Sequence, residues 1–290
     1  MSRQAITARA LLAAAAAEPG NQDAVLETQV LLAHALGRDR AWLYAHADDA
    51  LAVDAALHFH GLLRRRAAGE PLAYIVGRRE FWSLDLTVTR DVLIPRPETE
   101  LLVELALQRI PQGIQVDIAD LGTGSGAIAL ALAHERPQAR ILGTDCSGAA
   151  LAVARANSVR LAIQNVEFAE GDWCAALGNG RFDLIVANPP YIAAADPHLA
   201  QGDLRFEPAA ALASGVDGLD AIGTIVRGAP AHLKACGWLL FEHGWEQGGA
   251  ARALLRESGF VEVFSAPDLE ARERASGGRI GGSSASASRR

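Results

Sequence analysis

Apolar positions recur at helical spacing over the first part of the chain. They lie three or four residues apart from Val25 to Ala35, and a second pattern of this kind runs from Val53 to Ala68. Gly37 and the sequence Gly-Glu-Pro at 69–71 follow these patterns as stop signals. We therefore expect residues 1–78 to form a small helical domain.

The period of the pattern changes to two after this domain. Leu84, Leu86 and Val88 alternate with polar residues, which indicates a short hairpin or an extended connector over 79–96. From Pro97 onward, short apolar runs alternate with helical patterns. The expected strands span 116–121, 141–145, 182–187 and 237–242, with a further one near 166–168. This alternation predicts an α/β fold with a doubly wound, largely parallel sheet over 97–280, followed by a flexible Gly/Ser-rich tail over 281–290.

Composition narrows the class of protein. The chain has 290 residues, 50% of them hydrophobic, and a net charge of −7, which indicates a folded protein without a broad basic surface for nucleic acid. Three cysteines without a CxxC pair indicate reduced thiols and a cytoplasmic location. No apolar run reaches the ~18 residues of a membrane helix, so we expect no membrane contact. The stretch Ala13–Ala17 imitates a signal peptide, but an alanine-rich helix is the better interpretation.

A glycine-rich sequence joins an expected strand to an expected helix. It consists of Gly122, Thr123, Gly124, Ser125 and Gly126. Glycines there allow a sharp turn and the close approach of a ligand to the backbone. Asp145 ends the next strand, about 20 residues later, where a carboxylate can accept hydrogen bonds from both hydroxyls of a ribose. The pair indicates a nucleoside-containing ligand and leaves NAD open as one possibility.

A second candidate site is Gly171-Asp172-Trp173. Asp172 has the chemistry to accept a hydrogen bond from the exocyclic amine of an adenine, and Trp173 has the ring to pack beside the base. A tryptophan next to a loop is more often a packing residue, so this sequence is weak evidence by itself.

The third candidate site is Asn188-Pro189-Pro190-Tyr191, directly after an expected strand. The two prolines remove backbone donors and fix φ, and the carboxyl end of a parallel strand is where open α/β sheets bind ligands. The side-chain oxygen of Asn188 and the backbone oxygen of Pro189 are two acceptors for an NH₂ group, and the ring of Tyr191 can cover a planar group. The four residues therefore predict a site that orients a planar amine or amide.

Other chemistries lack their motifs. The chain contains no GxxxxGK[ST] and no GxSxG sequence, which disfavours a P-loop ATPase and an α/β-hydrolase. His58 and His60 are two positions apart, a spacing that points their side chains in different directions on a helix, and no zinc motif is present, so we expect no metal site. The arginines at 64–66 and 78–79 fit solvated helix ends, with contact to RNA or an acidic partner as the alternative.

With these motifs, the chain resembles the class I S-adenosylmethionine (SAM)-dependent methyltransferases that modify planar nitrogen. It is most similar to the PrmC/HemK family, which methylates the glutamine of the GGQ motif in class 1 peptide chain release factors. The similarity covers about residues 8 to 265 and rests on five stretches: 64–77, 92–100, 188–191, Asp217–Asp220 and Glu242–Gln247. The segment Ile94-Pro-Arg-Pro-Glu-Thr-Glu100 is the most specific of them.

The resemblance implies roles for the candidate residues. Gly122–Gly126, Asp145, Asp172, Trp173 and Asn188 would hold SAM, and Asn188–Tyr191 would hold the substrate glutamine. Glu98 is expected to help close the site. The fold implied is a Rossmann-like SAM-methyltransferase sheet, preceded by N-terminal helices that dock the release factor.

The resemblance leaves other readings open and weakens towards the end of the chain. We expect a monomer that does not bind nucleic acid directly. An adenine-N6 or cytosine-N4 nucleic-acid methyltransferase is the alternative, and an NAD-dependent oxidoreductase and a non-catalytic binding module are weaker ones. The sequence after about residue 265 only loosely matches the family, which leaves the pairing of the last strand open.

Overall fold

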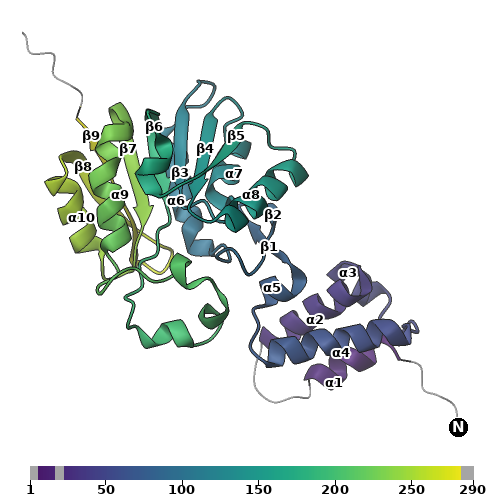
Figure 1. Ribbon diagram of the computed structural model, residues 1–290. Helices are drawn as coiled ribbons and strands as arrows, with labels where there is room; N and C mark the ends of the chain where they lie inside the picture. Colours follow the sequence, from purple (N-terminus) through teal and green to yellow (C-terminus); the bar gives the residue numbers. More distant parts are fainter. Residues whose placement is uncertain (1–5, 17–22, 282–290) are drawn as a thin grey trace, which may run out of the picture. The chain divides into compact units, whose positions relative to one another are not determined.

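The computed structural model describes residues 6–16 and 23–281 and divides into two compact units between Gly77 and Arg78. Figure 1 shows the helices of the first unit and the sheet of the second. The predicted tail lies almost entirely outside the described residues, as does the last alanine of the stretch that imitates a signal peptide.

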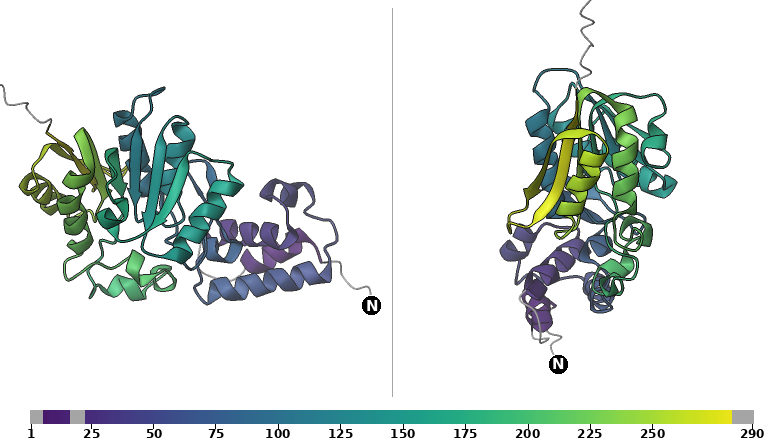
Figure 2. Two further views of the ribbon diagram at one scale, coloured as in Figure 1. Left: turned by 45° about the horizontal axis from the view of Figure 1, so that its top comes forward. Right: turned by 90° about the vertical axis from the view of Figure 1, so that its left-hand side faces the viewer.

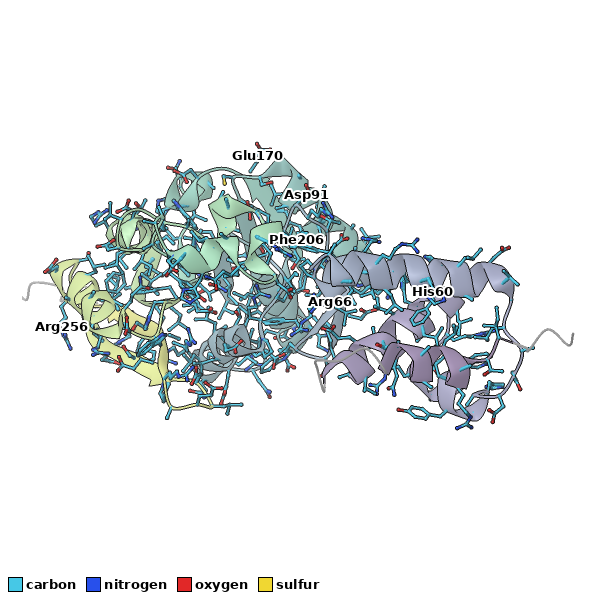
Figure 3. The ribbon with its side chains drawn as sticks, turned by 90° about the horizontal axis from the view of Figure 1, so that it is seen from below. His60, Arg66, Asp91, Glu170, Phe206 and Arg256 are labelled. Carbon is cyan, nitrogen blue, oxygen red and sulfur yellow. The ribbon has the colours of Figure 1, made fainter. Side chains whose placement is uncertain are left out.

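The first unit is helical. Its elements are α1 (Ala8–Ala16), α2 (Asp23–Leu36), α3 (Arg40–Ala45), α4 (Val53–Ala67) and α5 (Leu72–Val76). They enclose one apolar core, in which Leu31, Leu32 and Phe59 are fully buried. Two arginines of the run 64–66 form ion pairs within the unit. Arg65 pairs with Glu70, and Arg66, labelled in Figure 3, pairs with Glu27 of α2 at 2.8 Å.

The second unit begins with a hairpin, which was one of the two predicted forms of this segment. Strands β1 (Arg78–Phe81) and β2 (Leu84–Thr87) pair antiparallel. The two residues between them, Trp82 and Ser83, have φ of 51° and 58°. A two-residue turn with both φ values positive matches the right-handed twist of the strands, although it usually contains Asn or Gly. Glu100 supports this turn, since its carboxylate accepts a hydrogen bond from the Trp82 N–H at 2.8 Å.

A seven-stranded sheet forms the centre of the described part of the second unit. Its strands are β3 (Asp117–Leu121), β4 (Arg140–Asp145), β5 (Val166–Glu170), β6 (Phe182–Ala187), β7 (Leu233–Glu242), β8 (Phe260–Pro267) and β9 (Glu273–Ile280). Their spatial order is β5-β4-β3-β6-β7-β9-β8. The first five are parallel, and β9 lies antiparallel between β7 and β8. The predicted α/β fold is therefore confirmed, and the last strand, left open by the sequence, has a defined partner on each side.

Alternate residues of each central strand enter two different cores. On one face, Ile118 and Leu184 pack with α6 (Glu100–Arg109) and α7 (Ala127–Glu135). On the other face, Leu121 and Ile185 pack with α9 (Asp220–Gly228) and α10 (Gly248–Glu257). Figure 2 shows helices on both faces of the sheet. This burial on both faces explains why the strands read as continuous apolar runs.

Asn157 joins three segments of the second unit. It lies on α8 (Gly148–Arg160) and is fully buried. Its side chain accepts a hydrogen bond from the Thr87 N–H at 2.8 Å and donates to the backbone oxygens of Thr87 at 2.9 Å and Ser125 at 3.0 Å. One amide therefore fixes the end of the hairpin and the glycine-rich loop to the same helix.

We expect Asn157→Ala to lower the free energy of unfolding by about 2–4 kcal/mol, because the half-buried backbone groups of Thr87 and the buried backbone oxygen of Ser125 lose their partner. Urea unfolding followed by circular dichroism measures this loss. Gln164→Ala removes the same kind of group from an exposed position and is expected to change stability by less than about 0.5 kcal/mol. Equal effects of the two substitutions would contradict the role of Asn157.

Candidate active site

A cavity of about 240 Å³ lies at the carboxyl ends of the central strands. Strand order reverses between β3 and β6, and this switch point is where open α/β sheets leave a crevice. Nine of the predicted site residues line the cavity: Gly122, Thr123, Gly124, Ser125, Asp145, Asp172, Trp173, Asn188 and Pro190. The fold thus brings together all three candidate sequences, which lie up to 66 positions apart in the chain.

Three predicted residues lie outside this lining: Gly126, Pro189 and Tyr191. Gly126 precedes α7 with a φ of 84°, and a Cβ atom there would lie 3.0 Å from Leu130 and 3.3 Å from Ala154. Its place is therefore explained by close packing of α7 against α8. Pro189 is buried, and the hydroxyl of Tyr191 points to Glu242.

The glycine-rich loop lies against Trp173 and Asp145. A Cβ atom on Gly122 would lie 3.2 Å from the Trp173 ring. The Gly124 N–H donates to one carboxylate oxygen of Asp145 at 2.9 Å, and the Ser147 N–H donates to the other at 2.9 Å. These bonds hold the carboxylate at the cavity, and each of its oxygens retains capacity for one more donor.

Asp120 lies beneath the loop with 1% of its surface exposed. One carboxylate oxygen accepts hydrogen bonds from the Thr123 hydroxyl at 2.6 Å and the Ala129 N–H at 3.1 Å. The other oxygen has no partner among the described residues. Burial, with a smaller contribution from the charge of Asp145, raises the pKa of Asp120 to about 7. The carboxyl group therefore supports the loop, and the cost of its burial to the stability of the folded protein depends on pH.

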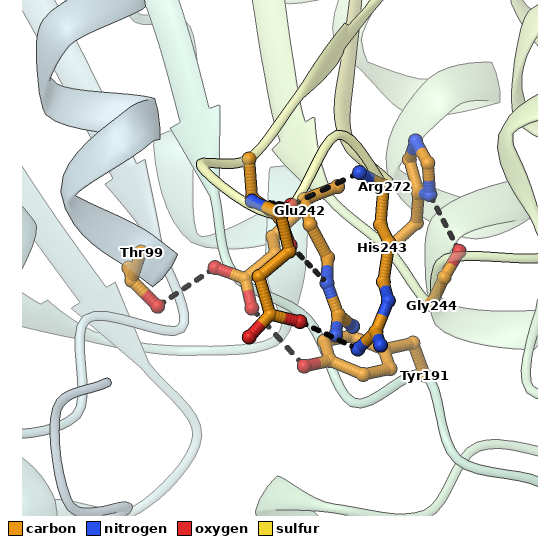
Figure 4. Close-up of polar contacts among 9 residues, drawn as sticks. Thr99, Tyr191, Glu242, His243, Gly244 and Arg272 are labelled. Atoms are coloured by element: carbon orange, nitrogen blue, oxygen red, sulfur yellow. Dashed lines mark hydrogen bonds and ion pairs between the residues drawn. The ribbon is translucent and has the colours of Figure 1, made fainter. Parts of the chain in front are cut away.

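A buried hydrogen-bond chain lies beside Asn188. The Asn188 NH₂ group donates to the Thr99 hydroxyl at 3.0 Å, and this hydroxyl donates to Glu242 at 2.7 Å. The Tyr191 hydroxyl donates to the other oxygen of Glu242 at 3.1 Å, as Figure 4 shows. Burial raises the pKa of Glu242, whereas the two hydroxyls and the charge of Arg274 favour its ionised form. Burial and the negative charge of Glu242 raise the pKa of Tyr191, so its hydroxyl stays protonated.

The backbone of Tyr191 is held by two sequences that lie far away in the chain. The Gln247 NH₂ group donates to the backbone oxygens of Tyr191 and Asp217, each at 3.0 Å. A Cβ atom on Gly218 would lie 2.1 Å from the Tyr191 oxygen, so only glycine fits there. The stretches 217–220 and 242–247 therefore fix the position of the Asn188–Tyr191 segment.

Two further segments line the cavity and were not among the predicted site residues. The first comprises Asp91, Val92, Leu93, Pro95, Arg96 and Thr99, and the second Pro208, Ala210 and Ala211. Asp91 is labelled in Figure 3. The segments are joined through Glu207, which pairs with Arg96 and accepts a hydrogen bond from the Ile94 N–H at 3.0 Å.

Glu98, expected to help close the site, is exposed and lies outside the lining, whereas its neighbour Thr99 lies within it. The apolar and small residues of these segments have no reactive or hydrogen-bonding side chains, so their residue types do not mark them as site residues in the sequence.

Over 6–16 and 23–281, no group of three or more His, Cys, Asp or Glu side chains is placed to hold a metal ion. No helix in this part of the chain has the length and apolar character to cross a membrane.

Known proteins resemble this chain over nearly its whole length. Residues 6–77 match the PrmC N-terminal domain, and residues 98–212 match the methyltransferase small domain. A release factor glutamine methyltransferase from Xylella fastidiosa (strain Temecula1) is 56% identical over 94% of this chain and 98% of its own length. Another from Burkholderia pseudomallei is 52% identical over 89% of this chain and 92% of its own. The chain belongs to the release factor glutamine methyltransferase family.

The solved structures place the fold of this release factor glutamine methyltransferase family member among other methyltransferases. A 16S rRNA methyltransferase from T. thermophilus, in complex with AdoMet and guanosine, is 20% identical with a TM-score of 0.51. The similarity covers 70% of this chain and 49% of that one. At this level of identity, the likeness concerns the fold.

The buried Asp120 predicts a pH dependence of stability. Its pKa of about 7 in the folded state exceeds the ordinary value of 3.8, so between these values the folded state binds more protons than the unfolded state. The free energy of unfolding therefore decreases as pH rises through this window. Asp120→Asn has no titrating carboxyl group at this position. We therefore expect its free energy of unfolding to decrease between pH 5 and pH 8 by about 2 kcal/mol less than that of the natural protein. Urea unfolding at four pH values tests this, and identical decreases in both proteins would contradict it.

Proposed function

We propose that the protein transfers a methyl group from SAM to the side-chain amide nitrogen of a glutamine, the one in the GGQ motif of class 1 peptide chain release factors. Two observations support the proposal. The close relatives carry the name release factor glutamine methyltransferase. Asn188 lines the cavity, and its NH₂ group is bonded to Thr99, which leaves its carbonyl oxygen without a donor among the described residues. A free carbonyl oxygen is an acceptor for an N–H group, which a glutamine amide supplies.

The residues around the cavity fit SAM. Gly122 and Gly124 have φ of 71° and 55°, and they leave the backbone of the loop open to a ligand. Asp145 and Asp172 provide carboxylates for hydroxyl and amine donors, and Trp173 provides an aromatic surface. When bound, SAM supplies a methyl group made electrophilic by a positively charged sulfur. We assign its binding to Gly122–Gly126, Asp145, Asp172, Trp173 and Asn188.

The substrate amide is a weak nucleophile, because its nitrogen lone pair is delocalised into the carbonyl group. We propose that Asn188 and the backbone oxygen of Pro189 accept hydrogen bonds from its two N–H groups, which favours a pyramidal nitrogen and the positive charge that it gains. Pro190 and Tyr191 hold the planar group in position. The nitrogen releases one proton after it has gained the methyl group, so the reaction needs no strong base.

We propose that the three parts of the chain have different roles. We assign docking of the release factor to the N-terminal domain, residues 1–78, the connection to residues 79–96 and methyl transfer to residues 97–280. The folded protein is proposed to act as a monomer in the cytoplasm, where release factors act, without direct contact to nucleic acid.

The side chain of Asn188 gives the test of this function. We expect Asn188→Ala to slow methylation of a recombinant class 1 release factor by about 100-fold or more, because one acceptor for the developing charge is lost. Mass spectrometry of the release factor after incubation with SAM measures the methyl group and locates it on the glutamine. Asn179→Ala, an exposed substitution of the same kind before β6, is expected to keep the natural rate.

Two results would contradict the proposal. One is a natural enzyme that leaves the release factor unmethylated but methylates DNA or RNA in a parallel reaction, which would favour the nucleic-acid methyltransferase. The other is methylation of a release factor whose GGQ glutamine has been replaced, which would place the reaction on another residue.

A further inference from the structure

The chain of hydrogen bonds beside Asn188 is built from three distant parts of the sequence. Thr99 comes from the 3-10 turn Pro97–Thr99 before α6, Asn188 follows β6, and Glu242 ends β7. Thr99 and Glu242 are 4% and 2% exposed. These two residues belong to the stretches 92–100 and 242–247, and the proposed reaction assigns neither of them a role.

The donors and acceptors in this series of hydrogen bonds determine the direction in which each bond is donated. A threonine hydroxyl has a single proton, and a side-chain amide donates through its NH₂ group and accepts through its oxygen. The Thr99 hydroxyl donates that proton to Glu242 at 2.7 Å. Its oxygen is therefore left as an acceptor, and the group that Asn188 turns towards it must be the NH₂ donor, at 3.0 Å.

This direction decides which end of the Asn188 amide faces the cavity. The NH₂ group is bound to Thr99, so the carbonyl oxygen is the end that has no hydrogen bond to the part of the chain that the structure describes. Without a carboxylate at 242, the Thr99 hydroxyl would be free to donate to the Asn188 oxygen instead. The amide would then turn over and present its NH₂ group to the cavity, where it would meet the N–H groups of a substrate amide donor to donor.

We propose that Thr99 and Glu242 are positioning residues that hold the Asn188 amide with its carbonyl oxygen towards the substrate. The inference rests on the proposed function to the extent that the substrate presents N–H donors. Glu242 also accepts the hydrogen bond of the Tyr191 hydroxyl at 3.1 Å, so the same buried group holds two members of the Asn188–Tyr191 segment. Thr99 and Glu242 act on the substrate through Asn188 and Tyr191.

Substitutions at Thr99 separate this role from a purely structural one. Thr99→Val keeps the shape but removes the hydroxyl, and we expect kcat for release-factor methylation to fall by about tenfold or more, since the acceptor is no longer held in place. The KM for the release factor and the Kd for SAM, measured by calorimetry, should change by less than about threefold. Thr99→Ser restores the hydroxyl and should recover most of the rate. Thr224→Val, an exposed threonine on α9, is the matched control and should leave the rate unchanged.

The double variant tests whether Thr99 acts through Asn188. In an Asn188→Ala background, Thr99→Val should change the residual rate by less than about twofold, because the side chain that it positions is already absent. A tenfold effect in both backgrounds would overturn the proposal. So would a Thr99→Val enzyme with the natural rate, or a Thr99→Ser enzyme as slow as Thr99→Val.

Glu242→Met provides a second route to the same answer. It removes both acceptor oxygens at similar side-chain length, so we expect a loss of kcat at least as large as in Thr99→Val. If this buried substitution prevents folding, the valine and serine variants of Thr99 still decide the question. Failure of the proposed function is a separate result, because the natural enzyme itself would then leave the release factor unmethylated.

Discussion

Parallel strands are joined by crossovers, and the direction of the crossovers changes between β3 and β6. At that point the chain leaves the two neighbouring strands towards opposite sides, so their carboxyl ends lie side by side without a helix across them. The glycine-rich loop follows one of these strands and Asn188 the other. The position of the active site is therefore a consequence of strand order, and the remaining segments of the cavity are arranged around this opening.

Buried polar groups are concentrated around the same opening. Asp120 lies under the glycine-rich loop, Glu207 under the segment that ends at Thr99, and Glu242 under Asn188 and Tyr191. Each is raised in pKa by burial, so each costs stability when it is ionised. In its ionised form each of them accepts hydrogen bonds only, and it thereby orders the donors around it. A hydroxyl in the same place could donate as well as accept, and would leave the orientation of a side-chain amide undetermined.

The candidate residues differ in how far the sequence could reveal them. The glycines, Asp145 and Asn188 carry recognisable chemistry and follow expected strands, and nine of the predicted residues do line one cavity. Gly126, Pro189 and Tyr191 were predicted with them and lie outside the lining of this cavity. Gly126 allows α7 to pack closely against α8, and the Tyr191 hydroxyl is bonded to Glu242. Thr99 was not singled out, although its neighbour Glu98 was expected to help close the site, because adjacent polar residues in a turn look alike until their directions are known.

The sequence by itself determined the five parallel strands of the second unit, their alternation with helices, and the three motifs at the strand ends. These features depend on apolar periodicity and on residue types within short windows, which the chain carries locally. Only the tertiary structure decided that β9 lies between β7 and β8. It also decided which donor faces which acceptor: Asn157 joins the hairpin to the glycine-rich loop, and Thr99 donates to Glu242 across 143 positions of sequence. A hydrogen bond depends on distance and direction within a fraction of an ångström, and these are set by the packing of the whole sheet with its helices.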